Sequence, residues 1–393
     1  MAEAAMHRQR MVSWGRLVAL AGTLLVAACS TVLPKGPPPP VTQPVSRPTA
    51  PIQGGIPTDT DRDRVALLVP LTGPNAGVGK SIANATQMAL LDTGSAKVRI
   101  TTYDTNGDAA AAANRALADG NKLFLGPLLS EDVKAIEPIA THAHVPIITF
   151  SNDSSVAGDG VYLLGYVPSQ AIDRVVSYAK SRGVTNFGGL VPNGLYGQRA
   201  STAFLRSVED AGGQVVSLQT YDRSSAAVKA AVDRLAKDGP FGAVLIADSG
   251  ATAAMIAPGV KKATGADTRL LGTELWNTES SIASKATLDG GWFASVPDGL
   301  YRQYAVKYRS RFGAAPYRLS SLGYDAVLLT LRVARDWTPG RAFPTAKMRD
   351  PGGFLGIDGP FRFGSNGVVQ RAMEVRKVGN GTIDVVSAAP AKF

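Results

Sequence analysis

The sequence predicts an α/β protein with two similar halves, each a parallel sheet flanked by helices. Two observations support this fold class. Short β-type runs alternate with helical stretches from Arg64 onward, and crossovers of that length connect parallel strands. The pattern then restarts, because 68–79 and 190–197 both read as Leu-Val-Pro, a glycine turn and the start of a helix. The roughly 330 residues after Arg64 suffice for two domains of ordinary size.

The individual elements follow from these patterns. In the first half we expect strands at 64–70, 97–104, 122–127 and 145–150 and helices at 75–92, 110–119 and 130–143. In the second half we expect a strand–turn–helix unit at 187–213, strands at 214–222, 242–248 and 268–276, and a helix at 226–238. Ligands of open α/β sheets bind beyond the carboxyl ends of the strands, so two facing edges would form a cleft.

Residues 1–28 are typical of an export signal. Three arginines precede a short apolar run, and Cys29, the only cysteine of the chain, follows that run directly. The stretch "LVAAC" resembles the lipobox of bacterial lipoproteins. Lipidation at Cys29 would also explain why an exported protein keeps one unpaired cysteine.

Residues 29–63 are expected to form a lipid-anchored tether. The segment is rich in proline and poor in aromatic residues, so it cannot bury enough surface to fold. A spacer that holds the folded part away from the membrane and a plain linker both fit this composition. Ser30 resembles an outer-membrane address, so we expect a periplasmic location with the outer rather than the inner membrane holding the anchor.

The turn after the first strand ends in Gly79-Lys80-Ser81, which is similar to a phosphate loop. The spacing excludes that interpretation, because the first glycine of such a loop would fall on Pro74, which has no N–H to donate. A protein outside the cytoplasmic membrane would also meet essentially no ATP. We therefore interpret the stretch as one edge of the ligand cleft.

Several longer stretches resemble the type I periplasmic-binding proteins of the leucine-binding branch. They are "LLVPLTGPNAGVG", "YDTNGDAAAAANRALADG" and "LGPLLSEDVKAIEPIATHAHVPIITFSND". The resemblance covers roughly residues 64–393. "GVYLLGYVPSQ" and "GPFRFGSNGVVQRAMEVRKVGNGTI", with the lipobox, are similar to the penicillin-binding protein activator lipoproteins within that family.

The resemblance implies two Rossmann-like lobes joined by a hinge of three crossings. Lobe 1 would comprise 64–168 plus 296–345, and lobe 2 would comprise 169–295 plus 346–393. It also implies ligand-binding residues in the cleft. Ser130 would take a ligand carboxylate, although it also fits a helix N-cap, and Glu274 would meet an ammonium group. The other implied contacts are Ser151, Asn152, Asp153 and Tyr196, and we expect Thr72 and Asp248 to bind the ligand in the same cleft.

One departure from the family pattern concerns the ligand. Asp248 and Ser249 stand where the amino-acid binders often have an aromatic residue, which argues against a branched-chain amino acid. An acidic, polar cleft would suit a different solute or no small ligand at all. Catalysis, cofactors and metal are not expected. Only three histidines exist. His7 lies in the export signal, and His142 and His144 are two residues apart on a predicted helix, so they diverge by about 200° and would not share a metal. We therefore expect neither a serine–histidine triad nor a metal cluster.

Two functions remain open at the level of sequence. The first is a non-enzymatic envelope lipoprotein that activates a peptidoglycan synthase, and the second is a solute receptor that delivers an amino acid or related solute to an ABC permease. The activator resemblance, the anchor and the tether favour the first. Nucleic acid is not an expected partner, because the net charge of +10 is scattered without a basic run.

Overall fold

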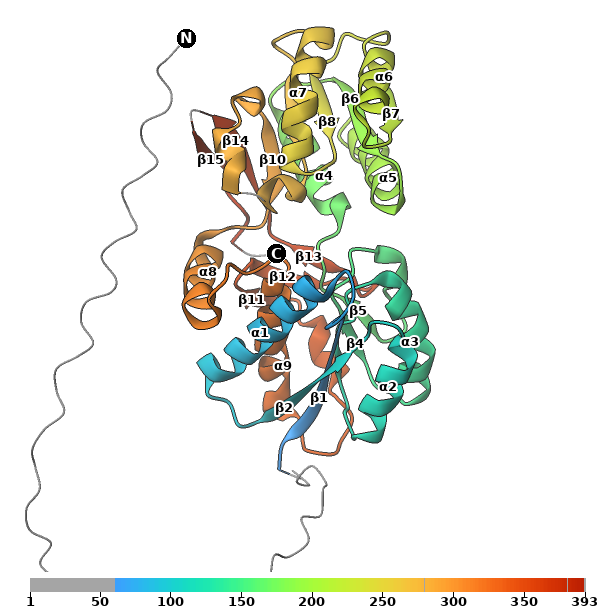
Figure 1. The fold of residues 1–393 in the computed structure, drawn as a ribbon, viewed down its shortest axis with the longest axis vertical. Coiled ribbons are helices and arrows are strands. Elements are labelled where there is room, and N and C mark those ends of the chain that lie inside the picture. Colours follow the sequence, from blue (N-terminus) through green and yellow to red (C-terminus); the bar gives the residue numbers. More distant parts are fainter. Residues whose placement is uncertain (1–60, 279, 380, 392–393) are drawn as a thin grey trace, which may run out of the picture. The chain divides into compact units, whose positions relative to one another are not determined.

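The computed structural model describes residues 61–391, apart from residues 279 and 380. The predicted signal peptide and Cys29, with the tether as far as residue 60, lie outside the described residues. The described part contains two sheets flanked by helices and a small third sheet (Figure 1). The predicted α/β fold class is therefore confirmed.

The first sheet has five parallel strands in the order β2-β1-β3-β4-β5. These strands are β1 (Asp63–Val69), β2 (Val98–Asp104), β3 (Phe124–Leu125), β4 (Ile147–Thr149) and β5 (Val161–Leu163). The helices of this half are α1 (Ala76–Thr93), α2 (Ala109–Ala118) and α3 (Ser130–His142).

Strand β1 shows why this sheet needs helices on both faces. Its residues are buried almost without interruption, as expected for a central parallel strand. Val65, Leu67 and Val69 share a core cluster with Ile82 of α1. The alternate residues Ala66 and Leu68 belong to a second cluster with the alanines of α2 and with α3. The two-residue period of the strand thus divides its side chains between two helical layers.

The second sheet has seven strands in the order β15-β14-β10-β9-β8-β6-β7. Five are mutually parallel: β6 (Asn186–Pro192), β7 (Gln214–Tyr221), β8 (Ala243–Ile246), β9 (Arg269–Gly272) and β10 (Trp292–Ser295). Two antiparallel strands extend it, β14 (Glu374–Gly379) and β15 (Thr382–Ser387). Its helices are α4 (Pro168–Ser181), α5 (Leu195–Asp210), α6 (Ser225–Leu235) and α7 (Gly250–Thr264).

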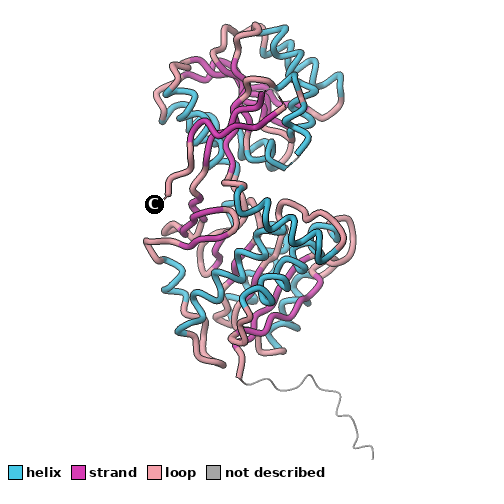
Figure 2. The backbone as a smooth tube through the Cα atoms, turned by 90° about the vertical axis from the view of Figure 1, so that its left-hand side faces the viewer, coloured by secondary structure: helices cyan, strands magenta, loops and turns pink. Residues whose placement is uncertain are grey.

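Three segments connect the two main sheets, and Figure 2 shows the backbone passing from one half to the other. Residues 164–167 lead from β5 to α4, and residues 296–298 lead from β10 to α8 (Gly299–Phe312). Helix α9 (Ser320–Val333) then packs against α1 of the first half. The third segment, 354–373, contains the small antiparallel sheet and leads into β14; its strands are β11 (Phe354–Gly356), β12 (Gly359–Phe363) and β13 (Val369–Arg371).

The two repeated junctions, β1–α1 and β6–α5, are built alike. In each, a glycine in the first turn of the helix lies against the carbonyl of the proline that follows or ends the strand. A Cβ atom on Gly79 would come well inside 3.0 Å of the Pro70 carbonyl, and one on Gly197 would do the same at Pro192. Only glycine permits this approach of helix to strand.

The same geometry accounts for the Gly-Lys-Ser sequence. Gly79 is the contact with the strand, Lys80 is exposed, and the Ser81 hydroxyl accepts a hydrogen bond from the backbone N–H of Tyr317 at 3.1 Å. All three residues lie within α1 rather than before it. Gly79 and Ser81 thus have structural roles, in helix packing and in a hydrogen bond, that do not involve phosphate binding.

Candidate functional site

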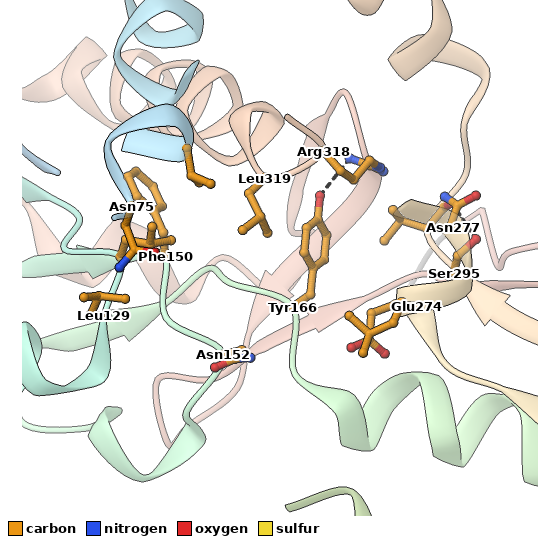
Figure 3. Close-up of a pocket in the computed structure, with 14 residues that line it drawn as sticks. Asn75, Leu129, Phe150, Asn152, Tyr166, Glu274, Asn277, Ser295, Arg318 and Leu319 are labelled. Carbon is orange, nitrogen blue, oxygen red and sulfur yellow. Dashed lines mark hydrogen bonds between the residues drawn. The ribbon is translucent and has the colours of Figure 1, made fainter. Parts of the chain in front are cut away.

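A cavity of about 350 Å³ lies between residues that follow strands of both main sheets (Figure 3). This volume lies within the usual range for small-molecule pockets. The first half and the connecting segments supply the wall at one side, and the loops after β9 and β10 supply the other. The lining residues are Asn75, Val78, Leu128, Leu129, Phe150, Asn152, Tyr166, Glu274, Leu275, Asn277, Ser295, Val296, Arg318 and Leu319.

The wall from the first half is mostly apolar. Val78 projects from the first turns of α1, Leu128 and Leu129 precede α3, and Phe150 follows β4. The polar groups of this wall are the amides of Asn75 and Asn152 and, at the connecting segments, the side chains of Tyr166 and Arg318. The cavity is therefore less polar than the sequence indicated, because the acidic Asp248 does not line it.

The wall from the second half is polar and centres on Glu274. Its Oε1 accepts a hydrogen bond from the Tyr196 hydroxyl at 3.2 Å, and that hydroxyl also lies 2.9 Å from the Thr273 hydroxyl. The second oxygen, Oε2, is buried and has no hydrogen-bond partner among the described residues. Burial raises the pKa of Glu274 to about 7, although the bonds from its own backbone and from Tyr196 lower it in part.

The pKa of Tyr196, which bonds Glu274, is raised as well. Burial, followed by the neighbouring Glu274 carboxyl, raises the pKa of Tyr196 well above its ordinary value. Tyr196 therefore remains a hydrogen-bond donor at neutral pH. It fixes one carboxyl oxygen of Glu274 and leaves the other without a donor.

The structure separates the predicted site residues into two groups. Only Asn152 and Glu274 line the cavity directly, and Tyr196 acts on it through Glu274. Ser130 is the first residue of α3 and is buried next to the lining residue Leu129. The Ser151 hydroxyl accepts the backbone N–H of Asp153 and so shapes the loop that carries Asn152.

The remaining predicted residues are already bound to other protein groups. Thr72 donates to Asp104 at 2.7 Å, at the end of the neighbouring strand. Asp153 is buried and forms an ion pair at 2.5 Å with Arg199, which lies on α5 of the second half. Asp248 accepts hydrogen bonds from Tyr221 at 2.9 Å and from Arg223 at 3.1 Å.

Most lining residues were not predicted from the sequence, and among these Arg318 and Tyr166 carry the strongest interactions. The Arg318 guanidinium donates to the Tyr166 hydroxyl at 2.9 Å (Figure 3) and forms an ion pair at 2.7 Å with the fully buried Asp358. Burial opposes the charge on Arg318, but Asp358 and Tyr166 raise its pKa above the ordinary value. No local motif signals this cluster, because its members are far apart in sequence.

Ser249 and the two neighbouring histidines lie at helix ends. Ser249 caps α7, where its hydroxyl accepts the Thr252 N–H, so Asp248-Ser249-Gly250 is a helix start. His142 is the last residue of α3, and His144 follows the helix with a φ of 54°. Across the described residues, no group of three or more metal-ligating side chains occurs that could hold an ion.

Two α/β halves with a cavity between their strand ends define the class of two-lobed ligand-binding proteins. A family model described as periplasmic binding protein matches residues 64–382, so the chain belongs to the periplasmic binding protein family. This is a family of binding proteins rather than enzymes, and it implies a periplasmic or extracellular location. Within the described residues, every helix is too short or too polar to cross a membrane.

Two curated relatives match part of the chain. An uncharacterised protein of Rickettsia prowazekii is 27% identical over 176 residues, which is 44% of this chain and 47% of the relative. The penicillin-binding protein activator LpoA of Photobacterium profundum is 26% identical over 164 residues, which is 40% of this chain and 27% of the relative. The matched regions thus span about half of the first relative and about a quarter of the second.

Solved structures match over nearly the whole described part. A putative branched-chain amino acid ABC transporter protein of Rhodospirillum rubrum has a TM-score of 0.73 at 19% identity, with 83% of this chain and 100% of that chain covered. The leucine-binding protein LivK of Thermotoga maritima has a TM-score of 0.64 at 20% identity, with 83% and 98% covered. At these identities the likeness shows the type I periplasmic-binding fold.

Proposed function

We propose that the protein is a non-enzymatic lipoprotein of the cell envelope that binds a small ligand in the cavity. The observation that carries this proposal is the Glu274 carboxyl. One of its oxygens is held by Tyr196, and the other is buried without a partner in a side chain that lines the cavity. A buried polar group is normally hydrogen-bonded, so an unpartnered one beside a cavity of ligand size favours a ligand that supplies the donor.

The walls suggest the chemistry of this ligand. An apolar body would pack against Leu128, Leu129 and Phe150, and an ammonium or N–H group would meet Glu274. An apolar amino acid or a related compound has this form. The objection that Asp248 raised against such a ligand loses its force, because Asp248 is bound to Tyr221 and Arg223 away from the cavity lining.

Isothermal titration of apolar amino acids, short peptides and cell-wall fragments against the purified chain tests the ligand proposal. Loss of a hydrogen bond to a buried carboxyl should weaken binding roughly tenfold in Glu274→Gln. Glu209→Gln, an exposed change on α5, is the matched control and should bind as the unchanged protein does. Equal affinities for both variants would contradict the assignment of Glu274.

For the biological role we propose a penicillin-binding protein activator that regulates peptidoglycan synthesis. The similarity to LpoA and the predicted lipid anchor support this role. A peptidoglycan synthase would then dock on an outer surface. Glu274→Gln should leave its stimulation unchanged, and an assay of synthase activity with the purified chain checks this expectation.

The second candidate is a solute receptor for an ABC permease, favoured by the formed cavity and by the ABC-transporter proteins of the same fold. Uptake assays in a strain that lacks the protein separate the two roles. Defective uptake of the bound solute with normal synthase activity supports the receptor. The reverse result supports the activator.

The anchor proposal has its own test, because Cys29 lies outside the described residues. Cys29→Ala should move the protein from the membrane fraction to the soluble periplasmic fraction. Separation of inner and outer membranes from cells with the unchanged protein then checks the proposed outer-membrane location. A Cys29→Ala protein that stays with the membranes would contradict lipidation at this residue.

A further inference from the structure

The strongest unexplained feature of the molecule is the buried charge cluster around Arg318. This residue lies just before α9, and its side chain is only 10% exposed. Burying a guanidinium is costly unless it is paired and hydrogen-bonded. The cluster is informative because of where the partners of Arg318 lie in the chain.

The partners of Arg318 come from all three segments that connect the main sheets. Tyr166 in segment 164–167 accepts a hydrogen bond from Nη1 at 2.9 Å, and its ring centre lies 5.5 Å from the guanidinium. Asp358 in segment 354–373 lies 2.7 Å from Nη2. Asp298 in segment 296–298 lies 3.9 Å from the same nitrogen.

The partners are also bonded to one another. Asp358 accepts hydrogen bonds from the hydroxyls of Tyr166 and Ser321, and the Ser321 hydroxyl also receives a bond from Arg318 at 2.9 Å. Burial alone would raise the pKa of Asp358, but Arg318 and Arg371 lower it, so this carboxyl stays ionised. The network therefore keeps its charges paired in the interior.

We infer that Arg318 is a positioning residue that clamps the three connecting segments to one another and to the wall of the cavity. A planar guanidinium with five donors can hold several partners in fixed directions, whereas a lysine ammonium is a compact point charge. Arg318 and Tyr166 also line the cavity, so a ligand there lies against the clamp. This link to a ligand rests on the proposed function, but the clamp itself does not.

Arg376 on β14 provides a matched comparison. It is also a buried guanidinium that pairs with Asp298, and it further bonds Glu374 and Asn277. Of the three connecting segments, however, Arg376 bonds only to 296–298 among the described residues, through Asp298 and the Val296 carbonyl. Loss of Arg376 should therefore release one segment, and loss of Arg318 should release all three.

Hydrogen–deuterium exchange on the intact chain without ligand tests the clamp. In Arg318→Met, peptides that contain each connecting segment should exchange roughly tenfold faster, while β1 and β8 exchange as in the unchanged protein. In Arg376→Met, of the three connecting segments only 296–298 should exchange faster. Faster exchange at a single segment in Arg318→Met, no change at any, or an equal increase in β1 and β8 would overturn the inference.

Arg318→Lys keeps the experiment decisive if the methionine variant does not fold. A lysine can pair with Asp358 but cannot hold Tyr166 and Asp298 as well, so the peptides around 164–167 and 296–298 should still exchange faster. Unchanged exchange at these two peptides would show that a point charge suffices, and the clamp would be wrong. Because no ligand is present, this outcome is independent of ligand binding at Glu274.

Discussion

The junctions β1–α1 and β6–α5 share one backbone construction but serve different purposes. Each places a glycine of the helix against a proline carbonyl at the end of its strand. In the first junction, the polar side chain of the turn, Thr72, bonds back to Asp104 of the adjacent strand. The residues that reach the cavity from this junction are Asn75 and Val78.

The second junction reaches beyond its own turn. Tyr196 holds Glu274 at the cavity wall, and Arg199, one turn further along α5, pairs with Asp153 of the first half. The comparison shows that the repeated glycine and proline determine how a helix leaves its strand. The side chains that follow determine whether the junction stabilises one sheet or connects the two halves.

The largest expected effect comes from changing the glycine that lies against a proline carbonyl in both junctions. Gly79→Ala and Gly197→Ala each force a Cβ atom onto a backbone carbonyl that cannot move aside, so each should lower the free energy of unfolding by about 3 kcal/mol or more. Urea denaturation measures this loss. Gly299→Ala is the control, since nothing lies within 4 Å of its Cβ position and alanine favours the helix. Similar losses in all three variants would contradict the shared construction.

The next effect tests the ion pair between Arg199 of the second junction and Asp153 of the first half. Arg199→Met leaves the buried Asp153 with only its bonds from Ser155, so the free energy of unfolding should fall by about 2 kcal/mol. Arg206→Met, at an exposed position of the same helix, should change it by less than about 0.5 kcal/mol. Thermal unfolding of both variants makes the comparison. If the two variants prove equally stable, the contact between the halves contributes nothing.

A pH-dependent effect sharpens the role of the second junction. The pKa of Glu274 is about 7 in the folded protein, above its ordinary value of 4.5, so the folded state holds more protons between these limits. Its contribution to stability is present below about pH 4.5 and is lost as the pH rises through 7. Glu274→Gln should therefore unfold like the unchanged protein at pH 4 and be more stable by about 3 kcal/mol at pH 8.

Urea titrations at several pH values give the difference between the two proteins. Glu209→Gln, which changes an exposed carboxyl, should show a difference that is flat across the same range. A flat difference for Glu274→Gln as well would mean that this carboxyl is not held in a raised-pKa environment.

The smallest effect concerns the first junction alone. Thr72→Ala removes one exposed hydrogen bond to Asp104, so the free energy of unfolding should fall by no more than about 1 kcal/mol. Ligand affinity should not change, because Thr72 does not line the cavity. A tenfold loss of affinity in a titration would restore Thr72 as a ligand contact.

The sequence anticipated most of the fold because its strands and helices carry clear local signals. The expected strand at 97–104 and helix at 130–143 correspond closely to β2 and α3. The expected strand at 268–276 is wrong in its second part, since β9 ends at Gly272 and a 3₁₀-helix begins at Glu274. The antiparallel strands β14 and β15 were not anticipated, because their place in the second sheet depends on pairing with the distant β10.

By itself, the sequence determined the fold class, the repeated junctions and the polar character of Glu274, since these follow from periodicity, glycine and proline placement and residue type. Only the tertiary structure decided which polar groups remain available at the cavity. Asp153 and Asp248 pair with Arg199 and Arg223 and do not line the cavity, while Glu274 lines it and keeps one oxygen without a partner. The physical reason is that burial and pairing of a charge depend on neighbours from distant segments, as Arg318 shows by joining three of them.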